Sequence, residues 1–208
     1  MQKFANLISN TFNPLIVPVL AAAYLLFGAN VFTFNVLNLQ AKLILLGILT
    51  FFMFLLPLVS LLALMQFGMA ENLNLPKRRQ RFVPFLLSIT FYAFCYRLLE
   101  TIEGLPDLLL HLILSGIILL ITALAFTSRF QISIHTMCMG SFVGMLCFIG
   151  LFYNADSFYM LLLALFVSGL VGFSRLVLNA HKPYQIYSGF LVGLIVQYIS
   201  LLGLTIYF

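Results

Sequence analysis

The sequence predicts an all-α fold, a polytopic bundle of six to seven transmembrane helices that forms a single domain over residues 1–208. Hydrophobic residues make up 63% of the chain and charged residues 7%, and the mean hydropathy is +1.16. Soluble domains average about 45–50% apolar and about 25% charged residues. The apolar residues also gather in runs of about 18 or more, the length that crosses a bilayer as a helix. Lipid is therefore the expected solvent for most of the surface.

Seven apolar runs are long enough to span a membrane. They cover residues 14–33, 41–67, 83–101, 107–127, 133–153, 157–178 and 184–207. The connections between them are short and carry turn-forming Asn, Gly, Pro and Asp residues. No internal repeat, low-complexity tract or linker divides the chain, and this predicts one transmembrane domain.

The charged residues are distributed unevenly between the two ends of the predicted bundle. Seven crossings place the N-terminus and the loops 67–83, 127–133 and 178–184 on one face. That face carries eight of the ten basic residues, namely Lys3, Lys77, Arg78, Arg79, Arg81, Arg129, Arg175 and Lys182, against the single acid Glu71. A positive-inside count places this basic face in the cytoplasm. Basic residues that bind a phosphate carry no information on topology, so the side stays open.

Several polar and sulfur-containing residues have ordinary structural explanations. Cys95, Cys138 and Cys147 lie inside apolar runs without metal-ligand spacing, which predicts small packing residues. Arg97 precedes Glu100 by three residues, so the two are expected to pair at the interface. A single histidine on the fourth run, His111, is expected to be buried and hydrogen-bonded. The few basic residues lie in short loops, which indicates no nucleic-acid partner.

The basic face gathers the residue types that phosphoryl transfer needs. His135 stands at the start of the fifth run, where free N–H groups and the helix dipole favour an anion. Arg175 closes the sixth run and His181 follows six residues later. One imidazole can attack phosphorus, a second can protonate the leaving oxygen, and guanidinium groups can hold the other oxygens. The alternative is that these side chains contact lipid headgroups at the interface. No carboxylates within the membrane stand near this face, so neither a metal nor a cofactor is predicted.

Two motifs carry a family resemblance. Ser174-Arg175, five residues and His181 resemble the Ser-Arg-x5-His segment of the type 2 phosphatidic acid phosphatase superfamily of membrane lipid phosphatases. Ser133-Ile134-His135-Thr136 resembles that family's Pro-Ser-Gly-His motif. The segments RRQRFVP, QISIHTMCMGSFVG and SRLVLNAHKPYQIYSGFLVG look like a compact bacterial branch of the superfamily. The resemblance covers residues 129–207 well and the first half loosely.

The resemblance implies a role for each matched residue. His181 would be the nucleophile that forms a phosphohistidine, and His135 the general acid. Arg175 would bind the phosphate, and the amides and hydroxyl of Ser133 would help to cradle it. The family has an aspartate four residues after the nucleophile, where this chain has Gln185. A glutamine carbonyl can fix the imidazole tautomer but cannot stabilise an imidazolium, so its presence implies a slower enzyme.

The resemblance is weaker in the first half. The nearest counterpart of the family's Lys-x6-Arg-Pro motif is Lys77 with Arg81 and Pro84, and Arg78 and Arg129 complete the predicted phosphate-binding set. The family core has three helices ahead of the Ser-x-His motif, whereas four apolar runs precede it here.

The function expected from these residues is a metal-independent lipid phosphatase in the bacterial cytoplasmic (inner) membrane. Its substrate would be a phosphate monoester or pyrophosphate of an amphiphile, of the phosphatidic acid, phosphatidylglycerol phosphate or polyprenyl pyrophosphate class. Gln185 favours the alternative, a catalytically weak or inactive relative that binds lipid phosphates. A third reading, a transporter or channel, lacks paired broken helices and carboxylates within a span. The sequence indicates no particular oligomeric state.

Overall fold

The computed structural model describes residues 1–75, 77–129 and 131–207, except for the side chains of residues 128, 129 and 207. Every regular element in these ranges is a helix, which confirms the all-α prediction. The elements are α1 Gln2–Thr11, α2 Val17–Phe27, α3 Phe32–Asn35, α4 Leu39–Thr50, η1 Phe51–Leu55, α5 Leu56–Gln66, η2 Arg78–Arg81, α6 Phe82–Glu100, α7 Asp107–Arg129, α8 Ile134–Phe152, α9 Phe158–Val177 and α10 Pro183–Tyr207.

Six helical segments of the described chain are long and apolar enough to cross a membrane. They are Leu39–Gln66, Arg78–Glu100, Asp107–Thr127, Ile134–Phe152, Phe158–Val177 and Pro183–Ile206. The chain is therefore a multi-pass membrane protein. The fourth segment is the central one, because 61% of its spanning stretch is buried, against 22–39% for the other five.

The predicted span over residues 14–33 is wrong. Its helical part, α2, has only 11 residues, about 16 Å of helix, which is too short for a hydrocarbon core of about 30 Å. Pro14 and Pro18 explain where the helix starts, because proline is tolerated only in a helix's first turn. Gly28 closes the helix, and Asn30 then turns the chain with a φ of 46°.

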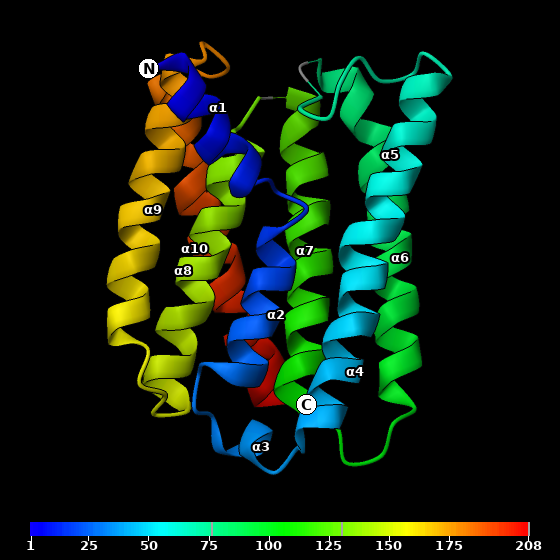
Figure 1. Cartoon of the computed structure of the whole chain (residues 1–208), viewed down its shortest axis with the longest axis vertical. Helices are drawn as coiled ribbons and strands as arrows, with labels where there is room; N and C mark the ends of the chain where they lie inside the picture. The colour runs from blue at the N-terminus through cyan, green and yellow to red at the C-terminus, as the bar shows by residue number, and fades with distance from the viewer. Residues whose placement is uncertain (76, 130, 208) are drawn as a thin grey trace.

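The N-terminal segment nevertheless carries the chain from one end of the bundle to the other. In Figure 1, α1 and the N-terminus lie at the upper end, α2 continues downward after a break, and α3 and the C-terminus lie at the lower end. The connections α5–α6 and α9–α10 lie at the upper end with α1. The N-terminus and these two connections therefore share one end of the bundle, as predicted, although two helices of 10 and 11 residues replace the first span.

The segment Leu39–Gln66 is interrupted near its middle. Residues Phe51–Leu55 form a π-helical turn directly before Pro57. Proline has no N–H to donate and its ring displaces the carbonyl one turn earlier, so a widened turn accommodates it. Met53 within this turn and Pro57 are buried side chains that face the interior of the bundle.

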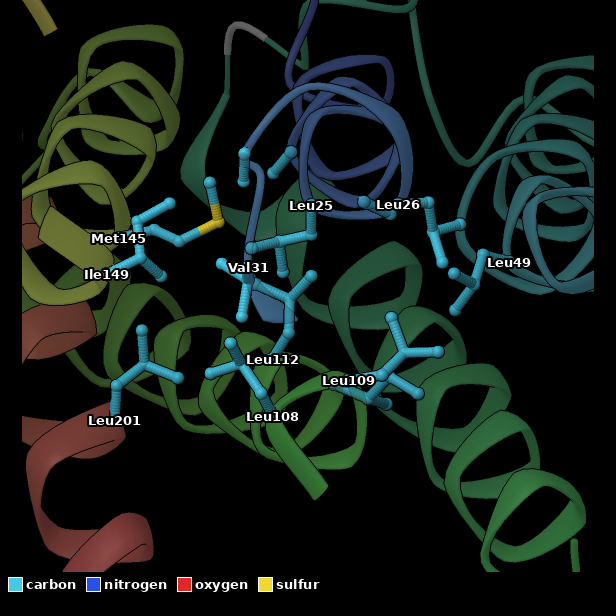
Figure 2. Close-up of a cluster of buried hydrophobic side chains, with 14 of the residues drawn as sticks. Leu25, Leu26, Val31, Leu49, Leu108, Leu109, Leu112, Met145, Ile149 and Leu201 are labelled. Carbon is cyan, nitrogen blue, oxygen red and sulfur yellow. The ribbon is translucent and has the colours of Figure 1, made fainter. Parts of the chain in front are cut away.

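The lower part of the bundle is filled by large aliphatic side chains. Figure 2 shows Leu25 and Leu26 of α2 in one cluster with leucines of α4, α7 and α10 and with Met145 and Ile149 of α8. Most are at most 2% exposed, so this part of the interior is close-packed. The polar residues that require another explanation lie at the upper end.

Three minor expectations have clear outcomes. Arg97 Nη1 lies 2.6 Å from Glu100 Oε2 on the exposed face of α6, which confirms that pair. Cys95 and Cys138 are buried and Cys147 is half-buried, and all are free thiols. His111 is buried as expected, but its Nδ1 atom has no hydrogen-bond partner among the described residues.

Candidate active site

Four basic side chains converge at the upper end of the bundle and line one cavity. His135 lies in the first turn of α8, Arg175 in the last turn of α9, and His181 in the connection that leads to α10. Arg81 closes η2, immediately before α6. Their exposed fractions are 4%, 5%, 9% and 3%, respectively. We call these four residues the basic cluster.

The two histidines are held together because the first turns of α8 and α10 are hydrogen-bonded to each other. The backbone N–H of Ser133 donates to the Gln185 carbonyl at 3.1 Å. The hydroxyl of Thr136 donates to the Ile186 carbonyl at 3.0 Å. The first bond satisfies an N–H group that a helix start leaves unpaired, and together the two bonds fix the start of α8 relative to the start of α10.

Glycines allow α8 and α10 to approach closely along their length. A Cβ atom at Gly140 or Gly193 would overlap the backbone of the opposite helix, at Phe190 and Met137 respectively. A Cβ at Gly144 would lie 2.5 Å from the Leu194 carbonyl oxygen. Such small-xxx-small spacing is the usual way in which membrane helices pack backbone to backbone.

Arg81 is anchored by the backbone on both sides of the site. Its Nε donates to the Leu75 carbonyl at 2.9 Å and its Nη1 to the Ile132 carbonyl at 3.2 Å. The guanidinium group therefore ties the α5–α6 connection to the segment that precedes α8. Carbonyl oxygens orient this cation, but they do not neutralise it.

Ser9 of α1 reaches the basic cluster, although it was not among the predicted site residues. Its hydroxyl oxygen accepts a hydrogen bond from Arg175 Nη1 at 2.7 Å and lies 3.4 Å from His135 Nε2. Ser9 and Ala5, one turn apart, are the buried residues of this amphipathic helix. That spacing is the one sequence signal for its buried face, but the partner of that face depends on tertiary packing.

The basic cluster lacks negative charge. The chain has five acidic residues, and none of them lines the cavity. Two polar atoms of the cluster, Arg175 Nε and His181 Nδ1, are buried without a hydrogen-bond partner in the part of the chain that the structure describes. Buried cations are costly unless they are paired, so the cavity is suited to an anion.

The His181 imidazole is held in its neutral form. Burial, together with the positive charges of Arg175 and Arg81, lowers the pKa of His181 to about 4. The neighbouring Gln185 side chain opposes this shift but makes no well-formed hydrogen bond to Nδ1. A neutral imidazole nitrogen has the free electron pair that a nucleophile requires.

Two of the predicted site residues have local structural roles. Gln185 Oε1 accepts a hydrogen bond from the Lys182 N–H at 2.9 Å, the reciprocal bond of a capping box at the start of α10. The Ser133 hydroxyl accepts the Thr136 N–H at 3.5 Å as the N-cap of α8. Its own N–H donates to Gln185, so that amide is not free to cradle a ligand, and Ser133 does not line the cavity.

The remaining predicted phosphate ligands do not line the cavity. Lys77 pairs with Glu71 on the exposed surface of the α5–α6 connection. Arg78 is exposed in η2, where its positive charge repels that of Arg81. The side chain of Arg129 lies outside the described residues. Fewer of the predicted phosphate-binding residues therefore line the cavity than the sequence indicated.

The cavity continues from the basic cluster into the apolar interior and has a volume of about 130 Å³. Apolar side chains of α2, η1, α5, α6, α7 and α8 surround it, including Ala21, Met53, Leu61, Leu112, Leu120, Phe142 and Met145. The cavity thus has a basic end suited to an anion and an apolar part suited to a hydrocarbon chain.

Nothing matches this chain among protein-family models, curated proteins or solved structures. The function must therefore be argued from the site itself.

The site has side chains that can bind a phosphate group and cleave its ester bond. Guanidinium groups recognise phosphate oxygens through several N–H donors at once. A neutral histidine and a second histidine stand on the same cavity, as a nucleophile and a proton donor must. Within the described residues, no three His, Cys, Asp or Glu side chains gather as metal ligands do.

Proposed function

We propose that this protein is a membrane-embedded lipid phosphatase that hydrolyses the phosphate monoester or pyrophosphate of an amphiphile through a phosphohistidine. The observation that carries the proposal is a basic cluster buried without counter-charge at the mouth of an apolar cavity. A lipid phosphate matches both parts, because its headgroup supplies the missing negative charge and its hydrocarbon fills the cavity.

The reaction would proceed in two balanced steps. The neutral His181 nitrogen attacks phosphorus, the bond between phosphorus and the lipid oxygen breaks, and His135 gives its proton to that oxygen. Water then attacks the phosphohistidine and returns a proton to His135, which releases inorganic phosphate. Arg175 and Arg81 stabilise the charge on the phosphoryl oxygens in both steps.

The resemblance to the type 2 phosphatidic acid phosphatase superfamily supports the same roles. Three long helical segments precede α8, the number that the resemblance implies, because the first apolar run contains only the short α2. Bacterial origin and the inner membrane belong to this proposal as well.

Phosphate release by purified protein tests the proposal. In detergent without added metal, the protein should release phosphate from phosphatidic acid, and His181→Ala should lower the rate by about 10⁴-fold. The control is His111→Ala, since His111 is also buried but does not line the cavity. Acid-labile radiolabel trapped on wild-type protein and absent from His181→Ala would identify the phosphohistidine. Full activity in His181→Ala would exclude this mechanism.

Gln185 favours a second candidate, a protein that binds lipid phosphates without turnover. Its carbonyl accepts the Lys182 N–H, and His181 Nδ1 has no hydrogen-bond partner among the described residues. Tight binding of phosphatidic acid that Arg175→Met abolishes, together with no phosphate release from the wild-type protein, would select this candidate.

A further inference from the structure

The depth of the cavity is defined by the helices that line it. On α8 the lining runs from His135 to Met145, and along η2 and α6 it runs from Arg81 to Tyr92. Ten or eleven residues of helix correspond to a depth of about 15 Å. Segments α2, α5, α6, α7 and α8 all contribute to the wall, so a chain in the cavity is enclosed by protein.

The lower end of the cavity is closed by packed side chains. Leu112 of α7 and Met145 of α8 line the cavity. Both also belong to the aliphatic cluster that Figure 2 shows. Gln197 of α10 lines the cavity at the same level, and its Nε2 donates to Ser115 Oγ at 2.7 Å. Both residues of this pair are buried. We call these groups the cavity floor.

We propose that the cavity holds one acyl chain of the lipid phosphate and limits that chain to about the thickness of one leaflet. This inference rests on the proposed function and narrows its substrate class to acyl lipid phosphates, in preference to polyprenyl ones. The hydrocarbon core of a bilayer is about 30 Å thick, so one leaflet and the cavity are both about 15 Å deep. An acyl chain of an ordinary phospholipid therefore reaches the cavity floor.

A longer chain cannot continue below the floor without disrupting the fold. It would have to displace the leucines of the close-packed cluster. Alternatively, it would have to pass between Gln197 and Ser115, which would break their hydrogen bond and leave both polar groups against hydrocarbon. Overpacking and loss of a buried polar partner are both strongly unfavourable. Polyprenyl chains are several times longer than one leaflet is thick, so they fail to seat their phosphate in the basic cluster.

A series of three monophosphates tests this inference with the headgroup charge kept similar. Dihexanoyl phosphatidic acid, dipalmitoyl phosphatidic acid and undecaprenyl phosphate are offered to the purified protein, and both binding and phosphate release are measured. Both phosphatidic acids should exceed undecaprenyl phosphate by about tenfold or more. Equal or greater use of undecaprenyl phosphate would overturn the inference.

A matched pair of variants tests the position of the chain. Ser141 lines the cavity below His135, and its hydroxyl donates to the Cys138 carbonyl. Ser141→Leu should reduce use of the dipalmitoyl lipid by about tenfold through steric blockage and reduce use of the dihexanoyl lipid by much less. The control is Ser168→Leu, because Ser168 makes the same kind of bond on α9 away from the cavity. An equal loss for both chain lengths would contradict the inference.

Photo-crosslinking gives a measurement on the wild-type protein that needs no folded variant. A diazirine at the end of the acyl chain of phosphatidic acid should label Leu112, Met145 or Gln197. Labelling confined to lipid-facing residues would place the chain outside the bundle and overturn the inference, although hydrolysis and its dependence on His181 would remain. If none of the three lipids is bound or hydrolysed, the proposed function fails together with this inference.

Discussion

Position 185 links the local structure of α10 to the reactivity of His181. The Gln185 side chain caps Lys182 and carries no charge. Gln185→Asp should place a carboxylate beside the His181 ring, stabilise the imidazolium and raise phosphate release by about tenfold or more. Gln185→Asn is the matched control, because it has the same shape as aspartate without the charge. Equal rates for the two variants would mean that position 185 does not act on the ring.

The ionisation of His181 gives a prediction about pH. Burial and the charges of Arg175 and Arg81 lower its pKa to about 4, whereas an unfolded chain titrates near 6.5. The ring should stay neutral down to about pH 4, and the fold should lose stability as pH falls below about 6.5, because the unfolded state then binds more protons.

The measurement is NMR of labelled histidine in a protein that retains only His181, with His111 and His135 replaced by asparagine. A titration midpoint near pH 4 is expected, and Arg81→Gln should move it upward by removing a nearby positive charge. A midpoint near 6.5 in the protein with both arginines would contradict the buried, cation-flanked setting.

The site residues differ in how far the sequence could identify them. His135, Arg175 and His181 stand at helix ends on the same side of the bundle, so helix parity was enough to group them. Ser9 was missed because it reaches Arg175 only through the packing of α1 against α9. Ser133 was predicted to cradle the phosphate and Gln185 to orient the His181 ring, but both make hydrogen bonds to backbone groups near the starts of α8 and α10.

At the scale of elements, the contact between α8 and α10 sets the distance between the two histidines. Gly193→Ala should destabilise the protein by about 1–3 kcal/mol, because its Cβ would overlap the Met137 backbone and force the helices apart. Activity should fall with the change in helix spacing. Gly203→Ala on the same helix is the control, since a Cβ there meets nothing within 4 Å.

Thermal unfolding in detergent, followed by circular dichroism, measures this difference together with the phosphatase rate. Equal unfolding temperatures for Gly193→Ala and Gly203→Ala would mean that the close approach of α8 and α10 is not required for the fold.

The broken N-terminal segment shows where hydropathy alone fails. Composition identifies residues 14–33 as apolar, but it does not indicate whether the helix is continuous. Asn13 and Pro14 at the break both line the cavity. The Pro14 carbonyl lies 3.8 Å from Cys138 Sγ, which fixes the break against α8. The long helices were predictable because each needs only an uninterrupted apolar run, whereas this break depends on its contacts with the rest of the bundle.

At the scale of the whole molecule, positive charge is concentrated at one end and no carboxylate reaches the basic cluster. Close-packed apolar side chains fill the lower end of the bundle, and the cation-lined cavity occupies its upper end. The fold therefore carries an electrostatic cost in its interior that a bound anion removes.

Anion binding should therefore stabilise the protein, and Arg175 should account for most of the effect. A ligand at about 100 times its Kd stabilises by about 2.7 kcal/mol, so phosphatidic acid should raise the unfolding temperature more than a neutral diacylglycerol does. Arg175→Met should unfold at a higher temperature than wild type without ligand, because an apolar side chain replaces a buried unpaired charge. It should also lose most of the lipid-induced shift. Arg79→Met, at an exposed arginine outside the cavity, is the control and should keep that shift. An equal shift in wild type and Arg175→Met would mean that the anion binds elsewhere, because only a ligand that contacts the basic cluster can relieve the cost of burying it.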